Sequence, residues 1–561
     1  MIEQQRMTWK SGTLALTLLL VFGVLVLAPL VLLCVAAIPA NGVELEALRR
    51  LLSDSPVQQA FLRSMAVALL ACGAASVVAI PIAIVALRCS PLTRRLIGLF
   101  GVLPLVMPAY LSAAVLQHLG SALELIAPLG VAGDRYAVGH VLTLILVFAL
   151  HYLPLILLGL LTGLTKIDRS LEESARNLGA GRLAIWRRVI LPLATPGYLL
   201  GASVMVLRVI EDAASPLVLG VGDMLAPQLL LRLGEAGLAD PQLQAGALLL
   251  LFVSLLITAF AWSALLPPLN TETDRHCARS LRWRRLPGAV LAFLPLLALA
   301  AVTLAPLIWL VLIAVGMQWS EGLLPTGQQG IAYTTLLHQQ WPGLVTTFGY
   351  AGIAALLTLL LGLLFGALTL TPGPIARSMR FVATAMLGLP GIVLALAYLH
   401  ASARLDLYLD TSPELAWGAL ILIVALKQLP LAQRLIAREL RALRHGSLAA
   451  ARNLGAHGPA LYLRIGLPAL IATLGAVLLF GAVAAIQEVS VALVLIRDPA
   501  APYAVTLFRS LQTAGDPAPW AAQGVLLVSF IATGLAIAFL LSRNACRSRA
   551  PIPSQSPRDQ A

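Results

Sequence analysis

Residues 173–180 read Glu-Ser-Ala-Arg-Asn-Leu-Gly-Ala, and residues 449–456 read Ala-Ala-Ala-Arg-Asn-Leu-Gly-Ala. The two stretches lie 276 residues apart, and the same offset pairs Leu191-Pro192 with Leu467-Pro468. Identity over Ala-Arg-Asn-Leu-Gly-Ala at one fixed offset indicates an internal duplication rather than chance. The duplicated motif therefore predicts a chain built from two related halves.

The composition indicates an integral membrane protein. Of the 561 residues, 59% are hydrophobic and 11% are charged, and the mean hydropathy is +0.91. These values exclude a water-soluble globular chain. The net charge of +13 does not indicate nucleic-acid binding, because the basic residues stand in short clusters between long apolar runs.

Long apolar runs predict about twelve transmembrane helices, since roughly 20 apolar residues cross about 30 Å of hydrocarbon. The runs of the first half lie near residues 13–38, 64–87, 96–116, 138–163, 194–219 and 244–266. The runs of the second half lie near residues 287–316, 344–370, 381–400, 415–436, 467–496 and 521–542. Prolines inside the runs, such as Pro108 and Pro390, predict bent helices, and we expect breaks around Pro196 and Gly481.

The duplication extends beyond the motif, because Leu153-Pro154 matches Leu429-Pro430 at the same offset. We predict an all-α integral membrane protein of two tandem six-helix repeats. Because six is even, both repeats enter the membrane from the same side and have parallel topology. The predicted domains are a first repeat at 1–266, a basic linker at 267–286, a second repeat at 287–542 and a disordered tail at 543–561.

The basic residues predict the orientation. Most of the 38 lysines and arginines, including the cluster from Lys427 to Arg464, share one side if both termini are inside. The positive-inside rule then places both termini, the linker and both copies of the motif in the cytoplasm.

The motif resembles the EAA loop of permease subunits in binding-protein-dependent ABC importers. The first copy has that family's acidic residue, alanine, glycine and Leu-Pro pair as Glu173, Ala175, Gly179 and Leu191-Pro192. The second copy has Ala449 in place of the acidic residue, which leaves unequal coupling of the two halves open. The whole chain resembles the fused two-repeat permeases that serve iron(III), thiamine or 2-aminoethylphosphonate uptake.

The resemblance implies a bacterial inner-membrane protein with two partners. A cytoplasmic ABC ATPase, present as a dimer, would receive short coupling helices from each loop, and a periplasmic substrate-binding protein would deliver the solute. The candidate ATPase-coupling residues are Glu173, Ala175, Arg176, Gly179, Leu191, Pro192, Ala451, Arg452, Gly455, Leu467 and Pro468.

The residue types in these loops suit a coupling role on chemical grounds as well. Gly179 and Gly455 permit a turn with positive φ, and the prolines of the two Leu-Pro pairs suit the first turn of a helix that enters the membrane. Arg176 and Arg452 can pair with carboxylates of a partner.

No cofactor is predicted on this chain. A P-loop needs Gly-x-x-x-x-Gly-Lys-Ser/Thr, and the sequence around Lys10, Lys166 and Lys427 does not complete it. We expect a transport subunit without enzymatic activity, with ATP used by the partner. No His, Cys or acidic residues stand at the spacing of metal ligands.

Polar residues inside apolar runs are candidates for a translocation pathway. They are Glu211, Asp212, Gln487, Glu488, His151 and Lys427. The offset of 276 pairs Glu211-Asp212 with Gln487-Glu488, and His151 with Lys427. The acidic residues predict either a gate between the halves or local neutralisation of Arg208, and both interpretations stand. We expect Lys427 to snorkel toward the cytoplasm and His151 to pack in the core.

Three functions compete at this point. The first is an ABC permease for a small solute, with iron(III) first and thiamine or 2-aminoethylphosphonate as alternatives. The second is a secondary transporter driven by an ion gradient, with Glu211, Asp212 and Glu488 as coupling carboxylates. A membrane enzyme is disfavoured, because the outside loops are short and offer His118 and His338 without a convergent catalytic set.

Overall fold

The computed structural model describes residues 2–36, 55–88, 91–122, 135–164, 167, 169–265, 286–318, 327–328, 333–370, 373–406, 412–456, 461–496, 501–513 and 515–547. These residues are almost entirely helical, apart from one short antiparallel ladder in which Met317 pairs with Gln328. In hydrocarbon every backbone N–H and C=O must be satisfied within the chain, and helices do this locally. The predicted all-α class is confirmed.

The first half contains the elements up to residue 265. They are α1 (Ile2–Phe22), η1 (Gly23–Leu27), α2 (Ala28–Ala36), α4 (Ser55–Arg88), α5 (Pro91–Val102), η2 (Leu103–Val106), α6 (Ala109–Ala122), α7 (Arg135–His151), α8 (Leu153–Leu164), α9 (Arg169–Asn177), α10 (Arg182–Ile185), η4 (Trp186–Ile190), α11 (Leu191–Glu211), α12 (Ala214–Val218), α13 (Leu225–Glu235) and α14 (Pro241–Leu265).

The second half contains the elements from residue 286. They are α15 (Leu286–Ala314), β1 (Met317–Gln318), β2 (Gly327–Gln328), α16 (Tyr333–Leu368), α17 (Pro374–Ala385), η6 (Met386–Gly388), α18 (Gly391–Arg404), α19 (Pro413–His445), α20 (Ser447–Asn453), η7 (Tyr462–Gly466), α22 (Leu467–Ile486), α23 (Ser490–Leu495), α24 (Tyr503–Thr513) and α25 (Pro517–Arg547).

Ten helices among the described residues are long and apolar enough to cross a membrane, or twelve if each of two sharply bent pairs is one span. The bent pairs are the predicted third and ninth spans. Their two parts meet at 90° before α6 and at 96° before α18. The prediction of about twelve spans is therefore confirmed, with two of them broken.

The two breaks have the same local cause. Met107 precedes Pro108 and Leu389 precedes Pro390, and a residue before proline is pushed out of the helical region. Both adopt extended conformations, with φ −99° and ψ 123° at Met107 and φ −97° and ψ 107° at Leu389. A new helix then begins in a different direction on each proline's far side.

The expected breaks around Pro196 and Gly481 are wrong, because α11 and α22 run through these residues. Gly481 instead allows close packing, since a Cβ there would lie 3.3 Å from the Cα of Ala355 on α16. The helix also does not start at Pro192, because a π-helical turn joins α10 to α11 without interruption.

The halves repeat one another in local structure. The π turn η4 precedes Leu191-Pro192, and the π turn η7 precedes Leu467-Pro468 at the same offset of 276. Helices α11 and α22 follow in each half. The domain boundaries themselves stay a prediction, and residues 267–285 of the linker and 548–561 of the tail lie outside the described residues. Residues 543–547 belong to α25, so the predicted tail begins too early.

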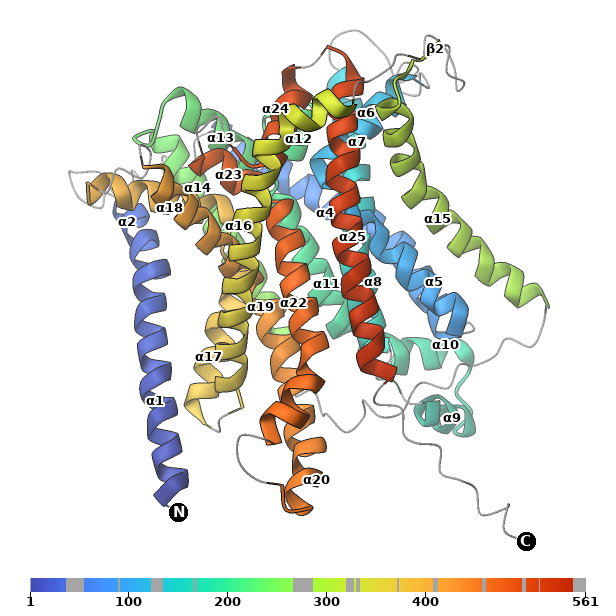
Figure 1. Ribbon diagram of the computed structural model, residues 1–561. Coiled ribbons are helices and arrows are strands. Elements are labelled where there is room, and N and C mark those ends of the chain that lie inside the picture. Colours follow the sequence, from blue (N-terminus) through green and yellow to red (C-terminus); the bar gives the residue numbers. More distant parts are fainter. Residues whose placement is uncertain are drawn as a thin grey trace.

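The first helix of each half contacts the other half, and α15 also packs against α25 of its own half. Helix α2 packs against α18 of the second half, where the Tyr398 hydroxyl donates to the Leu25 carbonyl at 2.6 Å. Helix α15 packs against α5 and α6 of the first half, where Trp309 Nε1 donates to His118 Nδ1 at 3.2 Å. Figure 1 shows α1 and α15 on opposite sides of the molecule, so each half is contacted at its outer side by a helix of the other half.

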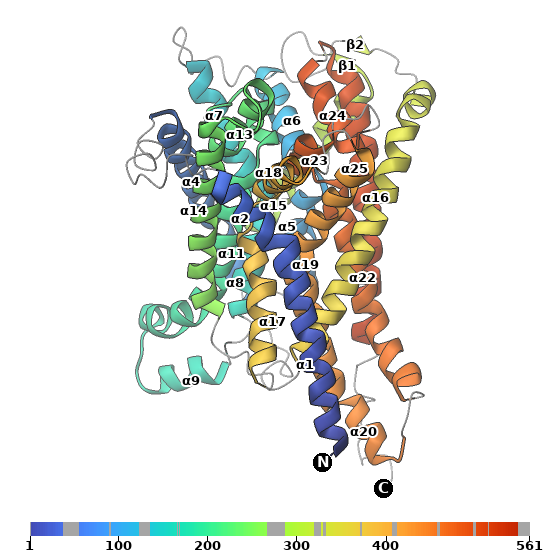
Figure 2. The same ribbon diagram turned by 90° about the vertical axis from the view of Figure 1, so that its left-hand side faces the viewer.

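The short helices α9 and α20 lie at the end of the molecule where α1 begins, and α6, α13 and α24 lie at the opposite end (Figures 1 and 2). Both copies of the repeated motif therefore face one side of the bundle.

Candidate functional site

Both copies of the motif end a short helix with the same turn. Gly179 has φ +82° after α9, and Gly455 has φ +85° after α20. In the first copy the N–H of Ala180 donates to the Ala175 carbonyl at 3.0 Å, and in the second the equivalent bond joins Ala456 to Ala451 at 3.0 Å. This six-to-one bond with glycine in the left-handed region is the Schellman motif. The positive φ predicted for the two glycines is confirmed.

The residue before each glycine is an exposed leucine. Leu178 and Leu454 are each 88% exposed, the highest values among the large apolar side chains described. They occupy equivalent positions at the two turns. The sequence analysis did not single them out, although both lie inside the repeated motif.

The other predicted coupling residues surround these turns. Glu173, Arg176 and Arg452 are exposed on the two short helices, and Ala175 is half-buried while Ala451 is buried. Residues of the two Leu-Pro pairs, Leu191, Pro192, Leu467 and Pro468, are exposed after the π turns. Their role in coupling stays a prediction.

The second turn has a packed underside. Leu443, Leu448, Ala451 and Leu461 form a separate buried cluster that ties α20 to the end of α19. Among the described side chains of α9 none is buried to this degree. The two turns therefore share a surface and differ in their support.

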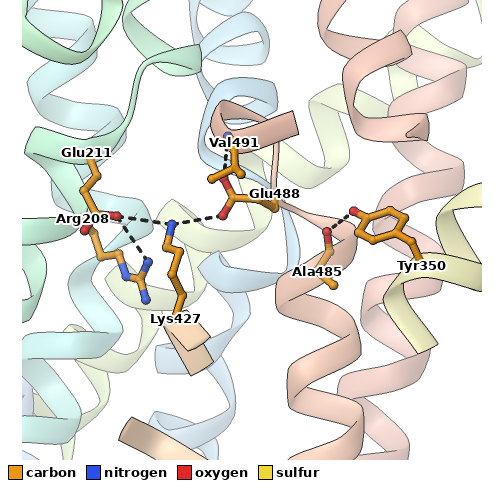
Figure 3. Close-up of polar contacts among 7 residues, drawn as sticks. All are labelled: Arg208, Glu211, Tyr350, Lys427, Ala485, Glu488 and Val491. Atoms are coloured by element: carbon orange, nitrogen blue, oxygen red, sulfur yellow. Dashed lines mark hydrogen bonds and ion pairs between the residues drawn. The ribbon is translucent and has the colours of Figure 1, made fainter. Parts of the chain in front are cut away.

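Four charged side chains meet where the halves touch (Figure 3). Lys427, close to the midpoint of α19, places Nζ 3.1 Å from Glu488 Oε2 and 3.3 Å from Glu211 Oε2. Arg208 Nη1 lies 3.7 Å from the same Glu211 oxygen. The side chains of Lys427, Glu211 and Glu488 are only 9% to 15% exposed. Buried charges inside membrane spans persist when they are paired, as all four are. We call these four residues the ion cluster.

The prediction that Lys427 snorkels toward the cytoplasm is wrong. Its ammonium is buried between two carboxylates. At this distance their attraction replaces the hydration that the ammonium would gain at the membrane surface. Lys427 therefore does not belong with the basic residues that report topology. The local pairing of Glu211 with Arg208 and the meeting of acidic residues from both halves are both present, and a gating role stays a prediction.

Asp212 and Glu488, which are 276 residues apart, begin the next short helices in the same way. Asp212 accepts hydrogen bonds from the Ser215 N–H at 3.1 Å and the Ser215 hydroxyl at 2.6 Å. Glu488 Oε1 accepts from the Val491 N–H at 3.2 Å. Each carboxylate satisfies the first donors of a helix, as capping residues do. Both of these hydrogen bonds of Asp212 are made within the first half.

The residues just before these caps reach across to the other half. Glu211 contacts Lys427 of the second half, and Gln487 Nε2 donates to the Leu105 carbonyl of the first half at 2.8 Å. Tyr350 OH donates to the carbonyl of Ala485, just before Gln487. The paired positions predicted from the offset are thus both at the contact between the halves.

His151, the counterpart of Lys427, is buried and packs edge-on against Tyr152 with ring centroids 4.7 Å apart. It lies outside the ion cluster, where it lines a cavity together with Pro104 and Met107 at the bend before α6. Its predicted place in the core is confirmed. In the described part of the chain no three His, Cys, Asp or Glu side chains are grouped to hold a metal ion.

Comparisons with known proteins agree with this architecture. A family model described as the binding-protein-dependent transport system inner membrane component matches residues 73–266, which include the first repeated turn. A protein of Haloferax volcanii named as a molybdenum ABC transporter permease is 31% identical over 216 residues, covering 38% of this chain and 74% of that protein. A protein of Haemophilus influenzae named as a ferric transport system permease is 23% identical over 355 residues, covering 60% of this chain and 54% of that protein.

The match to the Haemophilus protein spans about half of its length, and the match to the Haloferax protein spans about three quarters. The family resemblance drawn from the repeated motif is confirmed by these matches. The chain belongs to the family of binding-protein-dependent ABC transporter permeases.

Proposed function

We propose that this chain forms the membrane pathway of an ABC importer, which takes a small solute from a periplasmic binding protein and releases it in the cytoplasm. A separate ATPase dimer powers the movement by docking on the turns at 173–192 and 449–468. The end of the bundle that carries α9, α20 and the start of α1 is then cytoplasmic. Family membership supports the permease role.

The observation that carries the proposal is the pair of exposed leucines on geometrically identical turns. A twofold ATPase offers two equivalent grooves, and two equivalent apolar knobs on one face match them. Leu178 and Leu454 differ by the repeat offset and are exposed to the same extent. The glycines behind them fix the turns without side-chain bulk.

Iron(III) is the proposed solute, with thiamine and 2-aminoethylphosphonate as alternatives within the family. The relative named for ferric transport supports iron, and the relative named for molybdenum shows that related permeases are assigned to other solutes.

Crosslinking and purification of the tagged chain from native membranes test the proposal. Mass spectrometry should recover one ATPase and one substrate-binding protein, and the ligand of that binding protein names the solute. The matched control is Leu178→Ser/Leu454→Ser, which should keep the binding protein and lose the ATPase. Recovery of the chain without an ATPase from wild-type membranes overturns the proposal.

The gradient-driven transporter is the alternative outcome. It requires solute uptake into ATP-free vesicles carrying a proton or sodium gradient. Asp212 is already engaged with Ser215, and Glu211 and Glu488 share Lys427, so none of the three carboxylates is left for an exchangeable ion without a rearrangement.

A further inference from the structure

The ion cluster contains two kinds of contact. Within each half an acid is held by its own base: Arg208 lies 3.7 Å from Glu211, and Lys427 lies 3.1 Å from Glu488. Between the halves one contact joins Lys427 to Glu211 at 3.3 Å. The cluster is therefore a chain of four alternating charges that crosses the interface once.

The contact across the interface is the weaker of the two that Lys427 makes. Lys427 donates a hydrogen bond to Glu488, whereas Glu211 Oε2 accepts no hydrogen bond among the described residues and is held by charge alone. Charge-assisted hydrogen bonds are shorter and stronger than ion pairs without hydrogen-bond geometry. Glu488 is held further by the N–H of Val491. If the halves part, the cluster divides between Glu211 and Lys427.

Division at that point leaves no charge alone. The first half keeps Arg208 with Glu211, and the second half keeps Lys427 with Glu488. Leaving one buried charge without its partner is strongly unfavourable, and here each half carries away a complete pair. A contact of this design holds the halves together and still allows them to separate.

We propose that Arg208 and Glu488 are positioning residues that keep Glu211 and Lys427 paired within their own halves, so that the Glu211–Lys427 contact breaks and re-forms in every transport cycle. The proposal rests on the proposed function, because it assumes that the two halves move relative to each other. It assigns Arg208 a role exerted only through Glu211.

The spacing of the two exposed turns measures this movement. The full-length chain is prepared with serine at its native cysteines, Cys34, Cys72, Cys89, Cys277 and Cys546. Nitroxide labels are attached at Leu178→Cys and Leu454→Cys, and the chain is placed in lipid nanodiscs without solute or ATPase. Pulsed electron paramagnetic resonance then gives the distribution of distances between the halves.

Glu211→Gln removes the contact across the interface, and we expect a roughly tenfold rise in the ratio of separated to closed molecules, within the range seen for coupled neighbours. Arg208→Gln keeps that contact but leaves Glu211 unpaired after separation, so the ratio should not rise. The double variant Arg208→Gln/Glu211→Gln should behave like Glu211→Gln alone.

Arg232→Gln is the matched control, because Arg232 pairs with Asp240 at 3.4 Å wholly within the first half. It should leave the distances unchanged. Size-exclusion profiles and thermal unfolding identify variants that fail to fold, and Glu211→Asp then replaces Glu211→Gln.

Separation in Arg208→Gln as large as in Glu211→Gln, or a double variant that separates more than Glu211→Gln alone, overturns the proposal. Unchanged distances in every variant overturn it as well. Recovery of the ATPase in the copurification experiment is independent of these distances. Failure of the proposed role of the Glu211–Lys427 contact and failure of the permease assignment are therefore distinguishable.

Discussion

The two repeated turns present the same surface but differ in the side chains that are packed beneath them. Both present an exposed leucine before a glycine with positive φ. Beneath the second turn, Leu448 is buried in the small cluster that joins α20 to α19, and its counterpart beneath the first turn is the half-exposed Glu172. Figure 2 shows α9 set apart at the edge of the bundle.

The difference teaches which properties the duplication has kept. The geometry that a partner would touch is the same in both halves, and the packing that a partner would not touch has diverged. The second turn is packed against the end of α19, the helix that carries Lys427. The first turn is followed by the continuous helix from α10 to α11, which ends at Glu211.

The largest expected effect comes from the glycines. Gly179→Arg and Gly455→Arg force a side chain into positive φ, at a cost of about 1–3 kcal/mol, and place bulk on the docking surface. Because strain and bulk act together, we expect the ATPase recovered per chain to fall at least about a hundredfold for either change. No atom lies within 4 Å of a Cβ at either position, so the new side chain meets no clash and the strain is confined to the backbone of the turn. Normal solute uptake with either variant would contradict the docking role of that turn.

The next largest effect should distinguish the packing beneath the second turn from that beneath the first. Leu448→Ala removes the buried side chain beneath the second turn and should weaken its attachment by about 2–3 kcal/mol. Hydrogen exchange should then accelerate in residues 447–456. Glu172→Ala, at the equivalent place in the first half, is the matched control and should leave exchange in residues 169–180 as it was. Equal acceleration in both would remove the asymmetry.

A smaller effect should appear when each leucine is shortened. Leu178→Ala and Leu454→Ala each remove apolar surface worth about 2 kcal/mol when buried by a partner. Titration of the purified ATPase should show losses of affinity of similar size for the two variants. Leu405→Ala, at another exposed leucine at the end of α18, should bind the ATPase like the wild type. A loss confined to one turn would show that only one of them docks.

The smallest effect concerns the acidic residue that only the first turn has. Glu173→Ala gives the first turn the residue of the second, and an exposed charge contributes about 0.2–1 kcal/mol. ATPase affinity should fall by less than about fivefold, and Ala449→Glu should raise it by a similar factor. A loss as large as that of Gly179→Arg would show that Glu173 is the principal contact of the first turn.

Much of the fold could be predicted from the sequence, because it depends on local pattern. Apolar runs mark the helices, and glycines in the repeated motif mark the turns. Pro108 and Pro390 mark the two breaks through the residues before them. Pro196 misled the prediction, since a proline inside a helix can bend it without ending it, and α11 continues through Pro196.

The ion cluster could be predicted only in part. The candidates Glu211, Glu488 and Lys427 are recognisable as charges in apolar runs. Their partners are not, because the repeat offset pairs Glu211 with Gln487 and Lys427 with His151, whereas the contact joins Glu211 to Lys427. Which helices meet is decided by packing across the whole bundle. The exposure of Leu178 and Leu454 is hidden for a similar reason, since leucine is common everywhere in such a chain.

The packing of the N-terminal span against α18 affects the order in which the molecule assembles during synthesis. Leu25 and Tyr398, which join α2's end of the N-terminal span to α18, are 373 residues apart. At a synthesis rate of about 5–20 residues per second, the N-terminal span waits roughly 20 to 75 s in the bilayer before its neighbour is made. The span is suited to that delay: its most apolar window of 18 residues has a mean hydropathy of 3.1, and even in the finished molecule only 22% of that window is buried. This span is therefore made long before the helix against which it chiefly packs.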